Sequence, residues 1–221
     1  MKGVFMRNNL MRFMAIGLMT IIGLSVSEAQ ARAGKLGVGV DGAYYVFDSD
    51  FTGTKPSTGA NLNVSYSLSD YISLRGSMGV SQLQAKGSPY SSLLTTYVHG
   101  SLGLGVNFLP NESVNPFVYA AGSAFYFDPR TGGRMVLPSP HNGSGIGATL
   151  VGGAGVEFHL SEFVALSLAA EGSVPTTDRL DAVINGSKDM FYGVSVGIRY
   201  YVFDSGFVKR MLKAYEERAT K

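Results

Sequence analysis

The feature that most constrains the fold of this 221-residue sequence is an alternation of apolar and polar residues that recurs along most of its length. In residues 60–68, for example, Ala, Leu, Val, Tyr and Leu alternate with Asn and Ser. A period of two residues indicates a β-strand, because successive side chains of a strand point to opposite faces of the sheet. After the first 33 residues no stretch approaches the roughly 18 consecutive apolar residues of a spanning helix, which excludes a membrane protein built from several helices.

Eight segments of the chain are predicted to be strands. They comprise residues 36–46, 60–68, 72–81, 98–108, 117–127, 150–160, 164–174 and 192–202. All but one have an apolar face and a polar face. Residues 117–127 are aromatic or small on both faces, so the orientation of this fifth strand stays open. The sequence therefore predicts an all-β fold of eight antiparallel strands.

The connections between these strands differ in length in a regular way. The short ones lie at residues 69–70, 109–116 and 161–162, and the longer ones, rich in Gly, Ser and Pro, lie at residues 48–58, 84–93, 128–145 and 175–189. Because neighbouring antiparallel strands reverse direction, the short turns all fall at one end and the long loops at the other. Transmembrane barrels have this asymmetry, with short periplasmic turns and longer extracellular loops.

Alternation alone also fits a soluble barrel of the lipocalin kind. A face in contact with water is usually rich in Lys and Glu, but the eight segments contain no Lys, and Lys35 lies just before the first of them. The polar face consists of Ser, Gly, Asn and a few charges, as in the crowded interior of a narrow barrel. Aromatic residues gather near strand ends, such as Tyr66 with Tyr71 and Phe158 with Phe163, which is typical of membrane-interface girdles. These observations favour an up-and-down transmembrane β-barrel.

The first 33 residues are predicted to be an export signal. Lys2, Arg7 and Arg12 precede an apolar run at residues 13–24, and the small residues of 29–33 fit an A-x-A cleavage site. An uncleaved anchor is the alternative.

Removal of this segment leaves 14 basic and 15 acidic residues, which argues against a nucleic-acid partner. The absence of Cys excludes a lipoprotein anchor, disulfides and thiolate metal sites.

Residues 35–203 resemble the small eight-stranded outer-membrane barrels of Gram-negative bacteria, the family of the OmpA transmembrane domain. The resemblance rests on the alternation, the loop asymmetry, the tight turns in LSDYISLRGSMGV and GAGVEFHLSEFVALSL, and the last strand, GVSVGIRYYVF. That strand is similar to the assembly signal of the family, here Ser195, Gly197, Tyr200 and Val202. The resemblance implies the bacterial outer membrane as location, with its lipids, lipopolysaccharide and barrel assembly machinery as partners.

Residues 204–221 follow the last strand and depart from the pattern, since this strand often ends the chain in the family. They are too few for a peptidoglycan-binding domain. Their apolar residues fall on one helical stripe, which predicts an amphipathic helical tail on the periplasmic side; a fraying terminus is the alternative. The predicted division is thus a signal peptide at 1–33, a barrel at 34–203 and a periplasmic tail at 204–221.

Several ionisable residues lie on the polar faces and are predicted to point into the barrel. They are Asp41, Arg75, His99, Glu157, His159, Glu171 and Arg199. Buried charges need partners, so the two arginines are expected to pair with the three acids. The first and last strands adjoin when the barrel closes, which favours Asp41 as the partner of Arg199, with Glu171 as a competitor. The hypothesis is a charged plug that blocks solute flow, and a narrow pore is the alternative.

His99-Gly100-Ser101 resembles the His-x-Ser motif of barrels that deacylate lipid A, which would indicate an enzymatic function. His99 and Ser101 share the predicted lumen face, whereas lipid chemistry needs residues on the lipid side, and Glu112 lies in a turn at the opposite end. Residues 48–59 resemble the start of a calcium loop, but Gly59 stands where its Glu is needed. No catalytic residue, cofactor or metal site is therefore expected.

The function is then expected to reside in the long loops, or in the barrel itself as a structural part of the outer membrane. The loop at 128–145 carries Arg130, Arg134 and His141, which suits contact with lipopolysaccharide phosphates or an anionic partner. The prediction is a non-enzymatic surface barrel that contributes to envelope integrity, with adhesion through the long loops as a further role and the host or surface ligand unknown. The alternative is a narrow pore for small solutes.

Overall fold

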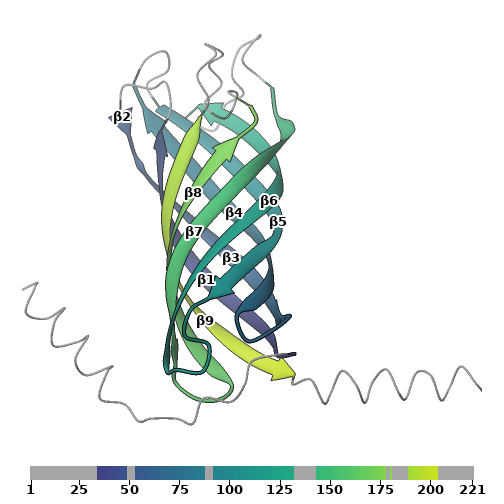
Figure 1. Cartoon of the computed structure of the whole chain (residues 1–221). Coiled ribbons are helices and arrows are strands. Elements are labelled where there is room, and N and C mark those ends of the chain that lie inside the picture. Colours follow the sequence, from purple (N-terminus) through teal and green to yellow (C-terminus); the bar gives the residue numbers. More distant parts are fainter. Residues whose placement is uncertain are drawn as a thin grey trace, which may run out of the picture.

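The computed structural model describes residues 34–48, 53–87, 92–131, 143–177, 180 and 189–203, and in these ranges the chain forms a closed antiparallel β-barrel (Figure 1). The barrel strands are β1 (Leu36–Asp48), β3 (Pro56–Ser67), β4 (Ile72–Lys86), β5 (Ser92–Asn107), β6 (Val114–Thr131), β7 (Gly145–His159), β8 (Val164–Pro175) and β9 (Met190–Phe203). Each pairs with its neighbour in the chain, and β1 pairs with β9 to close the barrel. A two-residue strand, β2 (Gly53–Thr54), adds to the end of β4. The predicted up-and-down barrel is confirmed.

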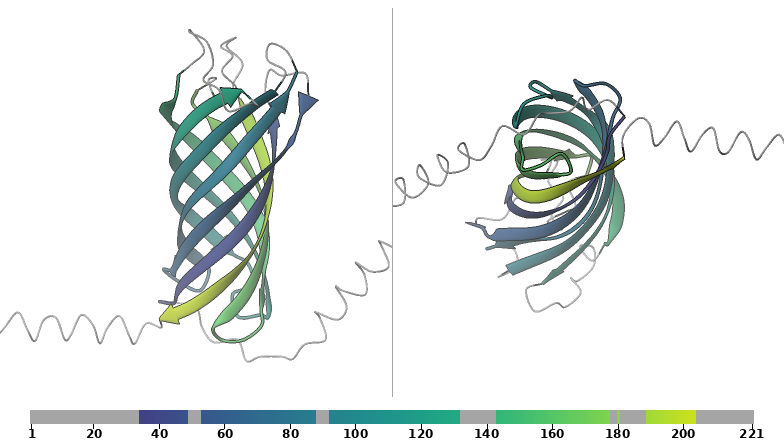
Figure 2. Two further views of the ribbon diagram at one scale, coloured as in Figure 1. Left: turned by 180° about the vertical axis from the view of Figure 1, so that it is seen from behind. Right: turned by 90° about the horizontal axis from the view of Figure 1, so that it is seen from below.

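Strands β1 and β9 pair along their whole lengths, and the start of β1 and the end of β9 lie at the end of the barrel that carries the short turns (Figure 2). In their register Gly39 lies opposite Arg199, and Asp41 lies opposite Gly197. Both ends of the barrel segment therefore leave from one side, which we call the turn end; the opposite side is the loop end.

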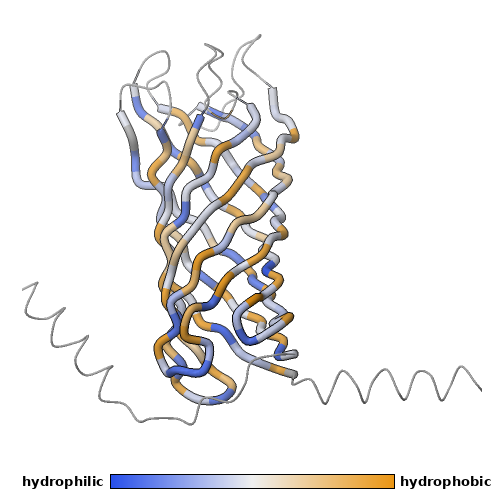
Figure 3. The backbone as a smooth tube through the Cα atoms, in the orientation of Figure 1, coloured by the Kyte–Doolittle hydropathy of each residue, from blue (hydrophilic) through white to orange (hydrophobic). Residues whose placement is uncertain are grey.

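The alternation sorts side chains between the outside and the lumen. Large apolar side chains lie exposed on the outer surface, among them Leu62, Leu102 and Val196, about three-fifths exposed in each case. Serines such as Ser65 on β3 and Ser81 on β4 are buried inside. Figure 3 displays this as a change between apolar and polar colour at successive residues along the strands.

The fifth predicted strand, whose orientation the sequence left open, is β6. Its odd-numbered residues face the lumen: Phe117, Ala121, Phe125 and Phe127 are buried, whereas Val118 and Tyr126 are exposed on the outer surface. The aromatic residues on this strand are thus divided between the two faces.

The connections at the loop end are longer than those at the turn end except between β4 and β5, because the strands extend further at the loop end than predicted. Strand β4 continues to Lys86 and β5 begins at Ser92, so the loop expected at 84–93 shrinks to residues 87–91. Strand β6 likewise continues to Thr131. Neighbouring strands continue to pair through these polar segments, because their inward-facing residues, such as Leu83 and Leu93, still pack in the lumen. Strands of 12 to 18 residues exceed the roughly 9–11 that cross a bilayer.

No helix long and apolar enough to cross a membrane occurs in the described part of the chain. The predicted signal peptide at 1–33 and the predicted tail at 204–221 both lie outside the described residues.

Candidate functional site in the barrel lumen

Glu157 is the centre of a cluster of charges at the turn end of the lumen. It is fully buried, and its Oε1 forms an ion pair with Nη1 of Arg199 and another, at 3.5 Å, with Nη2 of Arg75. Tyr201 Oη donates a hydrogen bond of 2.9 Å to Glu157 Oε2, and His159 Nε2 lies 3.9 Å from the same oxygen. We call these five residues the turn-end charge cluster. One carboxylate shared by two arginines and a hydroxyl meets the requirement that buried charges be paired.

Arg75 also connects this cluster to the neighbouring strands. Its guanidinium carbon lies 3.9 Å from the ring centroid of Phe117, in the arrangement of a cation–π contact. Its Nη2 donates to Asn107 Oδ1 at 3.4 Å, and Asn115 Nδ2 donates to the same oxygen at 3.1 Å. Asn107 and Asn115 are both buried, so side chains from β4, β5, β6, β7 and β9 together fill the turn end.

The structure gives Arg199 a different partner from the predicted Asp41. Asp41 instead accepts a hydrogen bond of 2.6 Å from Asn63 Nδ2 on the adjacent strand β3. Glu171, the predicted competitor, accepts one of 2.5 Å from Tyr119 Oη, across from β6. Strand adjacency misled the prediction because Arg199 reaches past β8 to Glu157 on β7.

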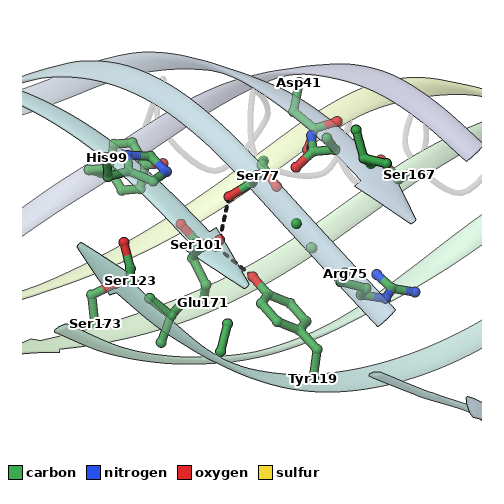
Figure 4. A pocket seen from close by; sticks show the side chains of 18 of the residues that line it. Asp41, Arg75, Ser77, His99, Ser101, Tyr119, Ser123, Ser167, Glu171 and Ser173 are labelled. Atoms are coloured by element: carbon green, nitrogen blue, oxygen red, sulfur yellow. Dashed lines mark hydrogen bonds between the residues drawn. The ribbon is translucent and has the colours of Figure 1, made fainter. Parts of the chain in front are cut away.

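A small chamber of about 70 Å³, lined by both polar and apolar residues, occupies the middle of the lumen (Figure 4). Ser77, Ser101 and Ser123 lie directly opposite one another on β4, β5 and β6 and line one side, with a hydrogen bond of 2.6 Å between the first two. Asp41 and Glu171 also face this space. The chamber has room for a few water molecules, each of which needs about 10–15 Å³ of such space.

Two glycines make room for the polar side chains beside the chamber. A Cβ at Gly197 would collide with the carboxylate of Asp41, and one at Gly79 would collide with the amide of Asn61 and lie 2.6 Å from His99 Cε1. The Nδ1 atom of His99 and the Oδ1 atom of Asn61 are buried without a hydrogen-bond partner among the described residues. Water in the adjacent chamber would supply the partners that buried polar atoms normally have.

The loop end of the lumen is apolar, which the sequence analysis missed. The buried cluster there, called the aromatic cluster below, consists of Ala43, Tyr45, Phe47, Leu83, Ala85, Leu93, Tyr97, Phe125, Phe127, Leu180 and Phe191. The ring centroid of Tyr97 lies 4.9 Å from that of Phe125 and 5.2 Å from that of Phe191. The sequence does contain a signal for this cluster. Tyr45 and Phe47 lie an even number of residues from Asp41, so on a strand they point to the same face as Asp41, which is predicted to be the lumen face. The lumen is therefore polar and charged toward the turn end and aromatic toward the loop end.

The remaining predicted residues fall in several places. Arg130 lies near the end of β6 and is already paired with Asp128, with Nη2 to Oδ2 at 2.9 Å. Arg134 and His141 lie outside the described residues. Of the predicted assembly signal, Ser195 and Gly197 face the lumen, while Tyr200 and Val202 are exposed on the outer surface of β9.

His99 and Ser101, the pair weighed as a catalytic motif, both line the chamber rather than the lipid-facing surface. Glu112 lies in the turn between β5 and β6, at the turn end. Among the described residues, no group of three or more His, Asp or Glu side chains is placed to hold a metal ion.

Comparison with protein-family models matches residues 16–201 to the family described as "Outer membrane protein beta-barrel domain". The chain belongs to this family. Its membership and its fold place it in the bacterial outer membrane, as the resemblance implied. No curated protein matches the sequence.

Several solved structures share the fold. Neisserial surface protein A is 16% identical, with a TM-score of 0.54, and the match covers 76% of this chain and 97% of that one. OprG from Pseudomonas aeruginosa is 14% identical with a TM-score of 0.53, covering 81% and 100%. Ail, the attachment invasion locus protein of Yersinia pestis, is 16% identical with a TM-score of 0.50, covering 77% and 99%. At these identities the likeness concerns the fold.

Proposed function

We propose that this protein is a non-enzymatic surface barrel of the outer membrane that contributes to envelope integrity and does not conduct solutes. The observation that carries the proposal is the filling of the lumen at both ends, by the turn-end charge cluster and by the aromatic cluster. The chamber between them is much smaller than a porin channel, in which 16 or more strands leave an aqueous passage. This arrangement supports the wall function over the narrow pore.

A non-enzymatic role is supported by the place of the candidate catalytic pair. His99 and Ser101 line the chamber inside the lumen, and Ser101 hydrogen-bonds to Ser77. A lipid acyl ester would have to cross the barrel wall to reach them.

Adhesion through the loop end is the further role that we propose. Two of the similar structures carry names that point to the cell surface, a neisserial surface protein and an attachment invasion locus protein, and the latter was also crystallised with the heparin analogue sucrose octasulfate. In this chain the ligands for such anions would be Arg134 and His141, because Arg130 is held by Asp128. Lipopolysaccharide phosphates offer the same chemistry.

Deletion of the gene, followed by complementation with the wild-type protein, tests the proposal. We expect the deletion strain to become more sensitive to detergent, with unchanged uptake of small solutes. A variant with Arg134→Gln and His141→Gln should restore detergent resistance but bind sulfated polysaccharide less well than the control variant Lys86→Gln. A deletion strain with normal detergent resistance and reduced solute uptake would instead support the pore.

A further inference from the structure

A shallow furrow crosses the outer surface of β6, β7 and β8, which lie side by side in the barrel wall (Figure 1). Its floor consists of Ala120, Gly152 and Gly172, which lie directly opposite one another on the three strands. A Cβ at Gly152 would meet no heavy atom within 4 Å, and one at Gly172 would approach only the ring of Tyr192, at 3.5 Å. Among the described residues, no side chain fills the floor at either glycine, so the floor is open to the surroundings of the barrel.

Larger apolar side chains border this floor. Leu150 and Val174, opposite each other on β7 and β8, form one wall, and Val194 on β9 lies along the other. Leu150 is 70% exposed and Val194 is 50% exposed, so both stand out from the surface. Two hollows, of about 760 and 630 Å³, meet over the floor, because both are lined by its two glycines. Among the described residues that line them, Glu171 is the only charged one, and its carboxylate faces the lumen.

The furrow follows a row of opposed residues that runs at a right angle to the strands. The row extends from Leu104 on β5, through the floor, to Tyr192 on β9. Adjacent strands lie about 4.8 Å apart, so four such spacings make the row roughly 19 Å long. Strands of transmembrane barrels tilt by about 35–45°, so the row covers roughly 11–13 Å of membrane depth, close to the roughly 15 Å of hydrocarbon in one leaflet. The furrow therefore has the reach of an acyl chain in one leaflet.

The upper end of the furrow lies on the outer side of the membrane. Tyr192 is the third residue of β9 counted from the loop end, whereas Leu104 is the fourth residue of β5 counted from the turn end. The loop end faces the outside of the cell, because the longer loops of transmembrane barrels are extracellular. Tyr44 lies beside Tyr192 at this end, and exposed tyrosines are typical of the headgroup level. The furrow thus descends from the headgroups of the outer leaflet.

The depth of the furrow determines what can lie in it. Lipid tails are as apolar as the barrel wall, so packing contacts, and not the hydrophobic effect, decide which chain stays bound there. A chain that lies in a furrow contacts the floor and both walls, and each further atom contact adds a small dispersion gain. The lipid of the outer leaflet is lipopolysaccharide, which makes one of its acyl chains the occupant.

We propose that the furrow is a binding site for one acyl chain of lipopolysaccharide. The chain lies on Gly152 and Gly172, between Leu150 on one side and Val194 on the other, with Tyr192 at its headgroup end. This inference rests on the envelope role of the proposed function, because it names the lipid through which the barrel is joined to the outer leaflet. It requires neither the closed lumen nor the long loops.

Leucine side chains on the floor test the site by filling it. The filled variant carries Gly152→Leu with Gly172→Leu. Its matched control carries Gly42→Leu with Gly100→Leu, since both of those glycines are exposed, have no heavy atom within 4 Å of a Cβ and lie outside the two hollows. Heat-shifted gel mobility verifies that each protein is folded. Ala120→Leu, which fills the floor from β6, takes the place of the filled variant if that protein does not fold.

Native mass spectrometry then counts the lipids that each protein retains. The purified full-length proteins are mixed in detergent micelles with hexa-acylated lipopolysaccharide or, separately, with phosphatidylethanolamine. We expect the wild-type and control proteins to retain one lipopolysaccharide molecule. The filled protein should bind it roughly tenfold more weakly, because the leucines remove the contacts of the chain with the floor. Phosphatidylethanolamine should be retained weakly by all of them.

The proposal is overturned if the filled and control proteins retain lipopolysaccharide equally, if none of the proteins retains it, or if phosphatidylethanolamine is preferred. A complex of two protein chains that disappears on filling would also overturn it, because the occupant would then be a second copy of the chain. Detergent sensitivity of cells that carry the filled variant separates this result from the proposed function. Weaker lipopolysaccharide binding with normal detergent resistance would support the site and contradict the envelope role.

Discussion

At the scale of single residues, Glu157 matters most because two arginines share its carboxylate in the buried turn-end charge cluster. Replacement of Glu157 by Ala leaves both guanidinium groups without this partner. Breaking a buried ion pair from one side typically costs about 3–5 kcal/mol, so we expect the free energy of unfolding to fall by about that much. Urea titration in lipid vesicles, followed by circular dichroism, measures the loss.

Glu162→Ala serves as the control for this change, because Glu162 lies in the exposed turn between β7 and β8. The two variants should differ by several-fold in their effect on the free energy of unfolding. Equal effects would mean that the shared carboxylate does not stabilise the barrel.

Gly197 illustrates how a missing side chain can shape the lumen. A Cβ at this position would collide with the carboxylate of Asp41, which lies opposite Gly197 on the neighbouring strand β1. We expect Gly197→Ala to lower the free energy of unfolding by about 1–3 kcal/mol, the usual cost of overpacking. Gly152→Ala is the control, since a Cβ at that outward-facing glycine would meet no heavy atom within 4 Å. A control variant that loses as much stability as Gly197→Ala would refute this role.

Sequence reasoning found the residues of the charge cluster but not their pairing. Parity shows that Glu157 and Arg199 share the lumen face, because parity depends only on the order of residues along each strand. The choice of partner depends on how far a long Arg side chain reaches across the lumen, and that follows from barrel closure. Tyr201, which completes the cluster, was within reach of the same parity rule because it lies two residues from Arg199.

At the scale of the strand, the outer face should tolerate charge only near the membrane boundary. Leu102 is 61% exposed near the middle of β5, and Leu68 is 54% exposed at the turn end beyond β3. An arginine on the lipid face costs about 2–4 kcal/mol at the bilayer midplane and about 0–1 kcal/mol near the interface. Leu102→Arg should therefore destabilise the barrel by several times as much as Leu68→Arg.

Urea titration of the two arginine variants in vesicles gives this comparison directly. Equal costs at the two positions would place Leu102 outside the hydrocarbon layer. They would also contradict the assignment of the exposed apolar face to lipid.

The alternation predicted the number and order of the barrel strands and, except for β6, their facing, because one face of each meets lipid and the other meets the lumen. It predicted their loop ends less well. There Gln82, Gln84 and Lys86 alternate with Leu83 and Ala85, but the polar residues of 84–93 predict a loop. Gln82, Gln84 and Lys86 lie on the outer face of β4, which continues to pair with β5 beyond its last apolar outward residue.

At the scale of the whole molecule, the barrel is a wall whose interior changes character along its axis. The charge cluster fills the turn end, the small chamber lies in the middle, and the aromatic cluster with Leu180 fills the loop end. Two closures of different chemistry act in series. A fluctuation that opens one of them leaves the other in place.

Single-channel recording of the purified wild-type protein in planar lipid bilayers tests this central claim most directly. The recording is made across a range of voltages, with a known porin reconstituted in the same lipid as the positive control. The closed lumen predicts a bilayer with no steady conductance above that of the lipid alone. Steady channels of porin size would contradict it.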